Sequence, residues 1–211
     1  MKKYAVITGD IIDFTRLDNE RREELIGDTD DVIKGWVKRP EDAAIFRGDS
    51  FQLIFEDLNL AVIRSIQLIC WFKKQATTAY PNLSTRISLG VGELAFKGKT
   101  VLDSDGAAFH LSGRNFDQLE AGELLRITTG DAEQDEQFNV LLLFMNLVMN
   151  NWSPHMAEVI YWVLEDQQAT QKEIAKRLNI FQPNIAKRLQ IARWKEMEKA
   201  LNFIAAQLQK A

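Results

Sequence analysis

The chain has 211 residues, 46% of them hydrophobic and 27% charged, which is enough apolar material for an ordinary core and excludes overall disorder. The single Cys70 excludes a disulfide framework, and neither a signal peptide nor an apolar run long enough to span a bilayer is evident, so we expect a cytoplasmic protein with no membrane partner. The net charge of −4 is the sum of +6 in residues 170–211 and −10 in the rest of the chain. This asymmetry favours two functions in one chain; the alternative is that the basic residues only form a solvated helix face.

Strands and helices alternate in the predicted elements of the first 128 residues. The stretch 4–15, YAVITGDIIDFT, begins as a strand and reaches a turn at Gly9-Asp10. The apolar patterns then predict helices at 17–37, 56–80 and 107–119, and strands at 43–46, 51–55, 85–96 and 124–128. The first six elements follow the βαββαβ order of a ferredoxin-like domain, which we assign to residues 1–130.

The remaining residues, 131–211, are predicted to form an all-α domain. Residues 130–137, GDAEQDEQ, are acidic and are interpreted as the linker. Helices are expected at 138–150, 154–166, 170–178, from Gln182 onward, and at 194–208. The predicted fold class is therefore α+β, with a ferredoxin-like α/β domain followed by a helical domain.

Two carboxylates in the first domain are candidates for a metal site. A ferredoxin-like sheet places the first strand beside the strand after the hairpin, so Asp10 and Asp49 can approach each other. Carboxylates at that range repel unless a cation lies between them, and Mg²⁺ or Mn²⁺ bound with nucleotide phosphates would suit the pair. The alternative is that each aspartate caps its own turn.

Four stretches of this domain resemble the motifs of class III nucleotide cyclases, in the same order. DIIDFT, residues 10–15, resembles the first metal-binding motif Asp-Ile-x-Gly-Phe-Thr, with Asp13 in place of Gly, and RGDSF, residues 47–51, resembles the hairpin that carries the second metal-binding Asp. RISLGVGE, residues 86–93, and AFHLSGR, residues 108–114, resemble the later strand and helix.

The resemblance implies a metal and ligand site, with one notable loss. It implies that Asp10 and Asp49 bind metal and that Arg114 and His110 act on phosphate. It also implies ligand contacts along the first motif and the hairpin, at Ile11, Phe14, Thr15 and Gly48. The groups that read the base in cyclases correspond here to Ile45 and Ala107, which cannot do so.

A closer resemblance is to the SatD-like family of bacterial proteins. It rests on Gly9-Asp10-Ile11, on GDSFQ at residues 48–52, and on DGAAFH at residues 105–110, and it covers most of the chain. The family implies a fold and a pocket but no defined reaction.

The basic end of the chain carries its own motif. TQKEIAKRLNIFQPNIAKRLQIARW, residues 170–194, resembles the helix-turn-helix of bacterial regulators, and its Thr170 and Glu173 predict a capping box. The side chains predicted to face DNA are Lys172, Lys176, Gln182, Asn184, Lys187 and Arg188. The alternative is a module that binds protein or a second copy of the chain.

The final helix is predicted to form the contact of a homodimer. Residues 194–208 are amphipathic, and the expected seam consists of Met197, Leu201, Ile204 and Leu208.

Together these patterns predict a DNA-binding transcriptional regulator whose cyclase-like domain senses a nucleotide or another anionic small molecule. One alternative is a divergent metal-dependent cyclase or phosphoryl-transfer enzyme that uses the same carboxylates. A third possibility is a degenerate domain that serves only assembly.

Overall fold

The computed structural model describes residues 2–209, which form a mixed α+β structure built on a five-stranded sheet. The strands of this sheet are β1 (Tyr4–Ile12), β2 (Ala43–Phe46), β3 (Ser50–Phe55), β4 (Ser84–Gly92) and β7 (Leu125–Thr128). Two short strands, β5 (Leu94–Phe96) and β6 (Asp105–Gly106), pair separately. Short 3-10 segments are η1 (Phe14–Arg16), η2 (Pro40–Asp42) and η3 (Val101–Asp103).

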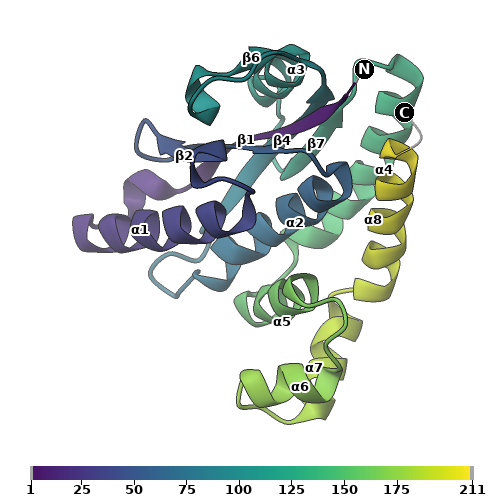
Figure 1. Cartoon of the computed structure of the whole chain (residues 1–211). Helices are drawn as coiled ribbons and strands as arrows, with labels where there is room; N and C mark the ends of the chain where they lie inside the picture. Colours follow the sequence, from purple (N-terminus) through teal and green to yellow (C-terminus); the bar gives the residue numbers. More distant parts are fainter. Residues whose placement is uncertain (1, 210–211) are drawn as a thin grey trace.

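The helices lie around the sheet and beyond it (Figure 1). They are α1 (Asn19–Trp36), α2 (Leu58–Lys74), α3 (Ala107–Phe116), α4 (Ala132–Asn150), α5 (Pro154–Glu165), α6 (Gln171–Arg177), α7 (Gln182–Ile191) and α8 (Trp194–Leu208). In the described residues 2–209, no helix is both long and apolar enough to cross a membrane.

The strand order across the sheet is β2-β3-β1-β4-β7. Neighbours are antiparallel except for β4 and β7, which are parallel. The register places Asp10 of β1 between Ser50 on one neighbouring strand and Arg86 on the other. The sheet therefore aligns an acidic and a basic side chain across the β1–β4 pair.

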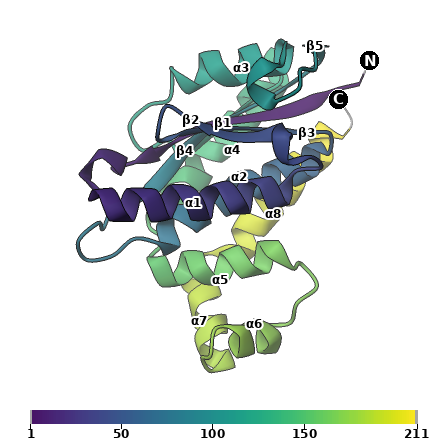
Figure 2. The ribbon, with the colours of Figure 1, turned by 60° about the vertical axis from the view of Figure 1, so that its left-hand side comes forward.

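Side-chain alternation along β1 separates the two layers of packing. Ala5, Ile7 and Ile11 belong to the large core shared with α1 and α2. Val6 packs on the opposite face with Ala108 of α3. Figure 2 shows α3 on one side of the sheet and α1 with α2 on the other.

Glycine allows α3 to approach β4 closely. A Cβ atom on Gly90 would lie 2.3 Å from the carbonyl oxygen of Ala108 and 2.4 Å from the backbone nitrogen of Ser112. Beside this contact, the Ser112 hydroxyl is 3.0 Å from that of Thr8 on β1. The helix therefore lies directly on the backbone of the strand.

Amide side chains of α4 cover the free edge of β7. Asn146, which is buried, accepts hydrogen bonds from the backbone N–H groups of Leu124 (3.2 Å) and Leu125 (3.1 Å) and donates to the Leu125 carbonyl (3.0 Å). Asn139, two turns earlier, accepts from the N–H of Ile127 (3.2 Å) and donates to its carbonyl (2.8 Å). A helix thus supplies the partners that another strand would normally provide.

The core continues across residue 130. Phe138 of α4, Ile160 of α5 and Leu201 of α8 belong to the same buried cluster as the residues between the sheet and α2. Packing of α5 and α8 against α2 leaves α6 and α7 outside this body, as Figures 1 and 2 show.

Several predicted boundaries are wrong. The predicted linker is mostly helix, because Asp131 caps α4, which begins at Ala132. The helix predicted over 56–80 ends at Lys74, where residues 77–80 form a hydrogen-bonded turn. The strand predicted over 85–96 breaks at Glu93 into β4 and β5.

The predicted dimer seam on the last helix is also wrong. Met197, Leu201, Ile204 and Leu208 are at most 3% exposed, because α8 packs against α2 and α4 of its own chain. Amphipathic spacing predicted a buried face correctly, but the partner of that face lies within the same chain.

Candidate ligand cleft and nucleic-acid interface

Asp10 is held by an arginine of the neighbouring strand. The Arg86 guanidinium donates to both carboxylate oxygens, from Nε at 2.9 Å and from Nη2 at 2.8 Å. Hydrogen bonding to Asp10 raises the pKa of Arg86 above its usual value, although partial burial opposes the shift. The guanidinium also lies 5.1 Å from the ring centroid of Phe116. This planar, two-bond pairing is the strongest geometry available to an ion pair.

Asp49 lies next to this pair, at the β2–β3 turn. Its backbone carbonyl accepts a hydrogen bond from the N–H of Ile11 at 3.1 Å, and its charge acts on Arg86. Asp49 therefore lies in the turn directly before β3, the strand beside β1, and both oxygens of Asp10 accept hydrogen bonds from Arg86.

Arg86 competes with any cation for the carboxylate of Asp10. Within residues 2–209 no group of three or more His, Cys, Asp or Glu side chains could hold a metal ion. Mg²⁺ or Mn²⁺ bound by Asp10 and Asp49 would need further ligands, such as phosphate oxygens.

The two residues predicted to act on phosphate lie on α3, whereas Asp10 lies on β1 and Asp49 in the β2–β3 turn. His110 and Arg114 are exposed on α3, and His110 Nε2 is 3.3 Å from the carboxylate of Asp105. In the described part of the chain, neither has a hydrogen bond or ion pair to Asp10 or Asp49.

Two of the residues predicted to contact ligand are neighbours, since a Cβ atom on Gly48 would lie 3.9 Å from the ring of Phe14. Ile11 is buried in the core, although it reaches the cleft described below. The ring of Phe14 lies 5.6 Å from the guanidinium of Arg22. Thr15 and Gly48 are exposed in the loops after β1 and between β2 and β3.

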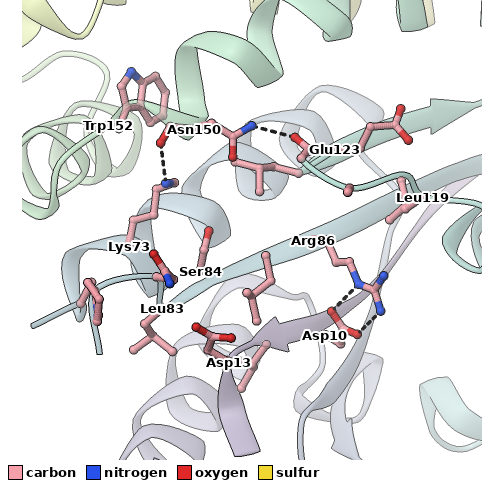
Figure 3. A pocket seen from close by; sticks show the side chains of 18 of the residues that line it. Asp10, Asp13, Lys73, Leu83, Ser84, Arg86, Leu119, Glu123, Asn150 and Trp152 are labelled. Atoms are coloured by element: carbon pink, nitrogen blue, oxygen red, sulfur yellow. Dashed lines mark hydrogen bonds and ion pairs between the residues drawn. The ribbon is translucent and has the colours of Figure 1, made fainter. Parts of the chain in front are cut away.

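A cleft of about 710 Å³ opens at the end of the sheet (Figure 3). One wall is the end of β1 and the start of β4, which includes Ser84 and the Asp10–Arg86 pair. The opposite walls are the end of α2 at Lys73, the loop 119–124, and the α4–α5 connection at residues 150–154. The cleft therefore lies between the sheet and the start of the helical region.

Sequence reasoning missed most of these walls. Arg86 could have been found, because an antiparallel β1–β4 pair sets it opposite Asp10 as a cross-strand pair of opposite charge. Lys73 and the α4–α5 connection carry no such signal, since only the tertiary packing brings them to the sheet.

Three of the four acidic side chains of the cleft are paired with an arginine, and the fourth, Glu120, is exposed and has no ion pair in residues 2–209. Besides the Asp10–Arg86 pair, the carboxylate of Asp13 lies 3.3 Å from Arg16, and Glu123 is paired with Arg126. Lys73 differs, because its ammonium donates only to the Asn150 carbonyl, at 3.4 Å, and has no carboxylate partner in residues 2–209. Burial lowers the pKa of this lysine.

A second, smaller core joins α5, α6 and α7. Val159, Ile174, Ala175 and Ile185 are buried together, and Leu178 and Leu189 pack against them while partly buried. The predicted capping box at Thr170 and Glu173 is present. A short turn joins the two helices.

The polar surface of α6 and α7 is largely free of internal contacts. Lys172, Lys176, Gln182, Asn184 and Lys187 are exposed, as predicted. Arg188 departs from the prediction, because it is partly buried and lies 3.8 Å from the carboxylate of Glu158 on α5.

One aromatic residue connects the cleft with α7. Trp152 lines the cleft and is buried, and its indole nitrogen donates to the carbonyl of Ala192, the C-cap of α7, at 2.9 Å. A change in the cleft wall at residues 150–154 therefore has a direct route to the end of α7.

Comparison of the chain with protein-family models, curated proteins and solved structures found no match.

Proposed function

We propose that the chain is a DNA-binding regulator in which α5, α6 and α7 form a helix-turn-helix and α7 reads the major groove. The observation that carries this proposal is the position of α6 and α7, which project from the body of the molecule with a polar and basic surface (Figures 1 and 2). In a helix-turn-helix, the start of the second helix contacts base edges while the first helix crosses the backbone.

The side chains at the start of α7 have the chemistry for this task. Gln182 and Asn184 are exposed amides, and amides of this kind pair with the N6 and N7 edge of adenine. Lys187 one turn later, with Lys172 and Lys176 on α6, provides charge for phosphates. Arg188 acts within the module, through Glu158, as a support for α7 on α5.

The strand order supports a cyclase-like, ferredoxin-type reading of the first region. The order β2-β3-β1-β4 with antiparallel neighbours is the arrangement expected of a βαββαβ unit, to which β7 is added. Asp13, which stands where the cyclase motif has glycine, has a φ of 62°, the left-handed conformation that glycine favours.

A sensing role for this region is supported better than a catalytic one. Arg86 occupies Asp10, and the base-reading positions hold Ile45 and Ala107. The cleft instead contacts Trp152, whose hydrogen bond reaches the end of α7. We therefore propose that a small molecule in the cleft adjusts the position of the reading helix.

DNA binding should appear as retention on DNA that weakens steeply with salt. In a filter-binding or fluorescence-anisotropy titration of the full chain, log K should fall linearly with log salt, by about 0.9 for each phosphate contacted. Replacing Lys187 by alanine should weaken binding to all sequences and reduce that slope by about 1. The full chain is required because α4, α5 and α8 share the core of the sheet.

Lys99→Ala is the matched control, since Lys99 is an exposed lysine on the loop after β5 and should leave the salt slope unchanged. Lack of DNA retention by the native chain at low salt would refute the proposed function.

A further inference from the structure

A buried hydroxyl in the cleft has no partner. Ser84, at the start of β4, is only 4% exposed, and its Oγ has no hydrogen-bond partner in the described residues. Leaving such a group unpaired costs about 1–3 kcal/mol. Because Ser84 lines the cleft, an atom of a bound molecule can supply the missing partner.

Lys73 provides charge on the same cleft. An ammonium has three donors, and the single hydrogen bond to the Asn150 carbonyl uses one of them. Partial burial disfavours the charged form of Lys73 and lowers its pKa. A nearby anion would stabilise the charged form and oppose this shift. Figure 3 shows Lys73, Ser84 and Asn150 around the same part of the cleft.

The start of α5 adds to the positive potential. Pro154, the first residue of this 12-residue helix, lines the cleft, so the positive end of the helix dipole lies at the cleft wall. Three of the four carboxylates of the cleft, those of Asp10, Asp13 and Glu123, are paired with an arginine. The fourth, that of Glu120, is exposed, so solvent and salt screen its charge.

We infer that the cleft binds a small-molecule oxyanion, a phosphate or a carboxylate, whose oxygens accept hydrogen bonds from Lys73 Nζ and Ser84 Oγ. The volume of about 710 Å³ is that of a site for a metabolite rather than for a single ion. The rest of such a molecule would extend toward the Asp10–Arg86 pair, which lines the other part of the same cleft.

Binding would also affect the helical region. Asn150 donates to the Gly122 carbonyl at 2.7 Å, and Trp152 donates to Ala192, so the connection between α4 and α5 joins the cleft to α7. An effect of the anion on DNA affinity rests on the proposed function, whereas anion binding itself does not.

Calorimetric titration of the full chain with inorganic phosphate and, separately, with succinate tests this inference. The native chain should bind at least one of the two, and the stronger binder identifies the source of the oxyanion. Lys73→Met keeps the alkyl stem but removes the charge, and Ser84→Ala removes only the hydroxyl. Each should weaken binding at least tenfold, whereas Lys99→Met should not.

The inference would be overturned if the native chain bound neither probe, or if Lys73→Met and Ser84→Ala both bound with the affinity of the native chain. If Lys73→Met does not fold, Ser84→Ala alone decides. DNA retention measured without added anion separates the two ideas, since both variants should retain DNA as the native chain does.

A different observation concerns the outer face of α4. Val140, Leu143, Phe144 and Leu147 form a stripe at helical spacing and are 51–65% exposed. Residues 138–154 contain no Asp, Glu, Lys or Arg. A shallow hollow beside Leu147 extends the stripe to Ile191 at the end of α7. The opposite faces of α4 are already engaged with the core and with β7.

We propose that a second copy of the chain covers this stripe, with α4 packed against α4. Four large side chains at this exposure present on the order of 500 Å² of apolar surface, near the upper limit for a monomer and more than half of the roughly 800 Å² per partner of a stable interface. The uncharged stripe is complementary to itself under two-fold symmetry. On the proposed function, such a dimer also provides two reading helices for half-sites about 34 Å apart.

The oligomeric state decides this proposal. Light scattering coupled to size exclusion should give a dimer for the native chain at micromolar concentration and a monomer for Leu143→Glu and for Leu147→Glu. Phe96→Glu, which places the same charge on an equally exposed apolar residue of β5, should remain dimeric. A monomeric native chain, or a dimer that persists in both stripe variants, would overturn it, whatever the result of the DNA titration.

Discussion

Replacing Asn146 by alanine is expected to lower the free energy of unfolding by about 3 kcal/mol or more, because it leaves three backbone groups without partners and each costs about 1–3 kcal/mol. These are the N–H groups of Leu124 and Leu125 and the carbonyl of Leu125. Water cannot replace the side chain readily, since Asn146 is buried. Urea unfolding followed by circular dichroism measures the loss.

Gln137→Ala is the matched control for this change. Gln137 is an exposed amide on the same helix, and its replacement should alter stability by no more than about 0.5 kcal/mol. Similar unfolding midpoints for Asn146→Ala and Gln137→Ala would mean that the hydrogen bonds of Asn146 to β7 contribute little to stability.

The second large effect is expected at Gly90. A methyl group there would lie 2.3 Å from the carbonyl oxygen of Ala108 and 2.4 Å from the backbone nitrogen of Ser112. Both atoms belong to the backbone of α3, so no side-chain rotation can relieve the clash. Gly90→Ala should therefore force α3 away from the sheet and destabilise the protein by about 3 kcal/mol, at the upper end of typical overpacking costs.

A glycine on the other side of this contact offers a sharp comparison. Gly113 lies within α3, and a Cβ atom there would meet nothing within 4 Å. Gly113→Ala should consequently stabilise the protein by up to about 1 kcal/mol through helix propensity. Replacing glycine by alanine is thus expected to lower stability at Gly90 and to raise it at Gly113, although the two elements are in contact. Thermal unfolding of the two variants checks both predictions. Equal shifts of the two melting temperatures would contradict the close approach of α3 to β4.

Local pattern was sufficient for much of the fold. Alternation and β-branched residues in Tyr4–Ile12 predicted a strand where one occurs. Asp10 pairs with Ser50 across β1 and β3, which brings Asp49, the residue before Ser50, to the neighbourhood expected for it. The capping box at Thr170 likewise depends on residues three positions apart, which a sequence pattern can detect.

Long-range packing explains what the pattern could not predict. The spacing of Met197 and Leu201 indicates a buried face but not which surface buries it, and here that surface is α2 and α4. In the sequence, Lys73 is an ordinary cation at the end of a predicted helix. Only the tertiary fold brings Ser84 and Pro154 to the same cleft as this lysine. Residues 130–137 are acidic and lack apolar side chains, as linkers often do, but Asp131 caps α4 and residues 132–137 form the first turns of that helix.

The hydrogen bonds of Asn139 and Asn146 to β7 also limit how the protein can associate. An edge strand normally offers a row of free N–H and C=O groups to which a strand of another chain can add. At this edge, Asn139 and Asn146 already occupy the groups of Leu125 and Ile127. The sheet is thereby closed to extension into a larger intermolecular sheet through β7, and loss of Asn146 would open a route to aggregation as well as lowering stability.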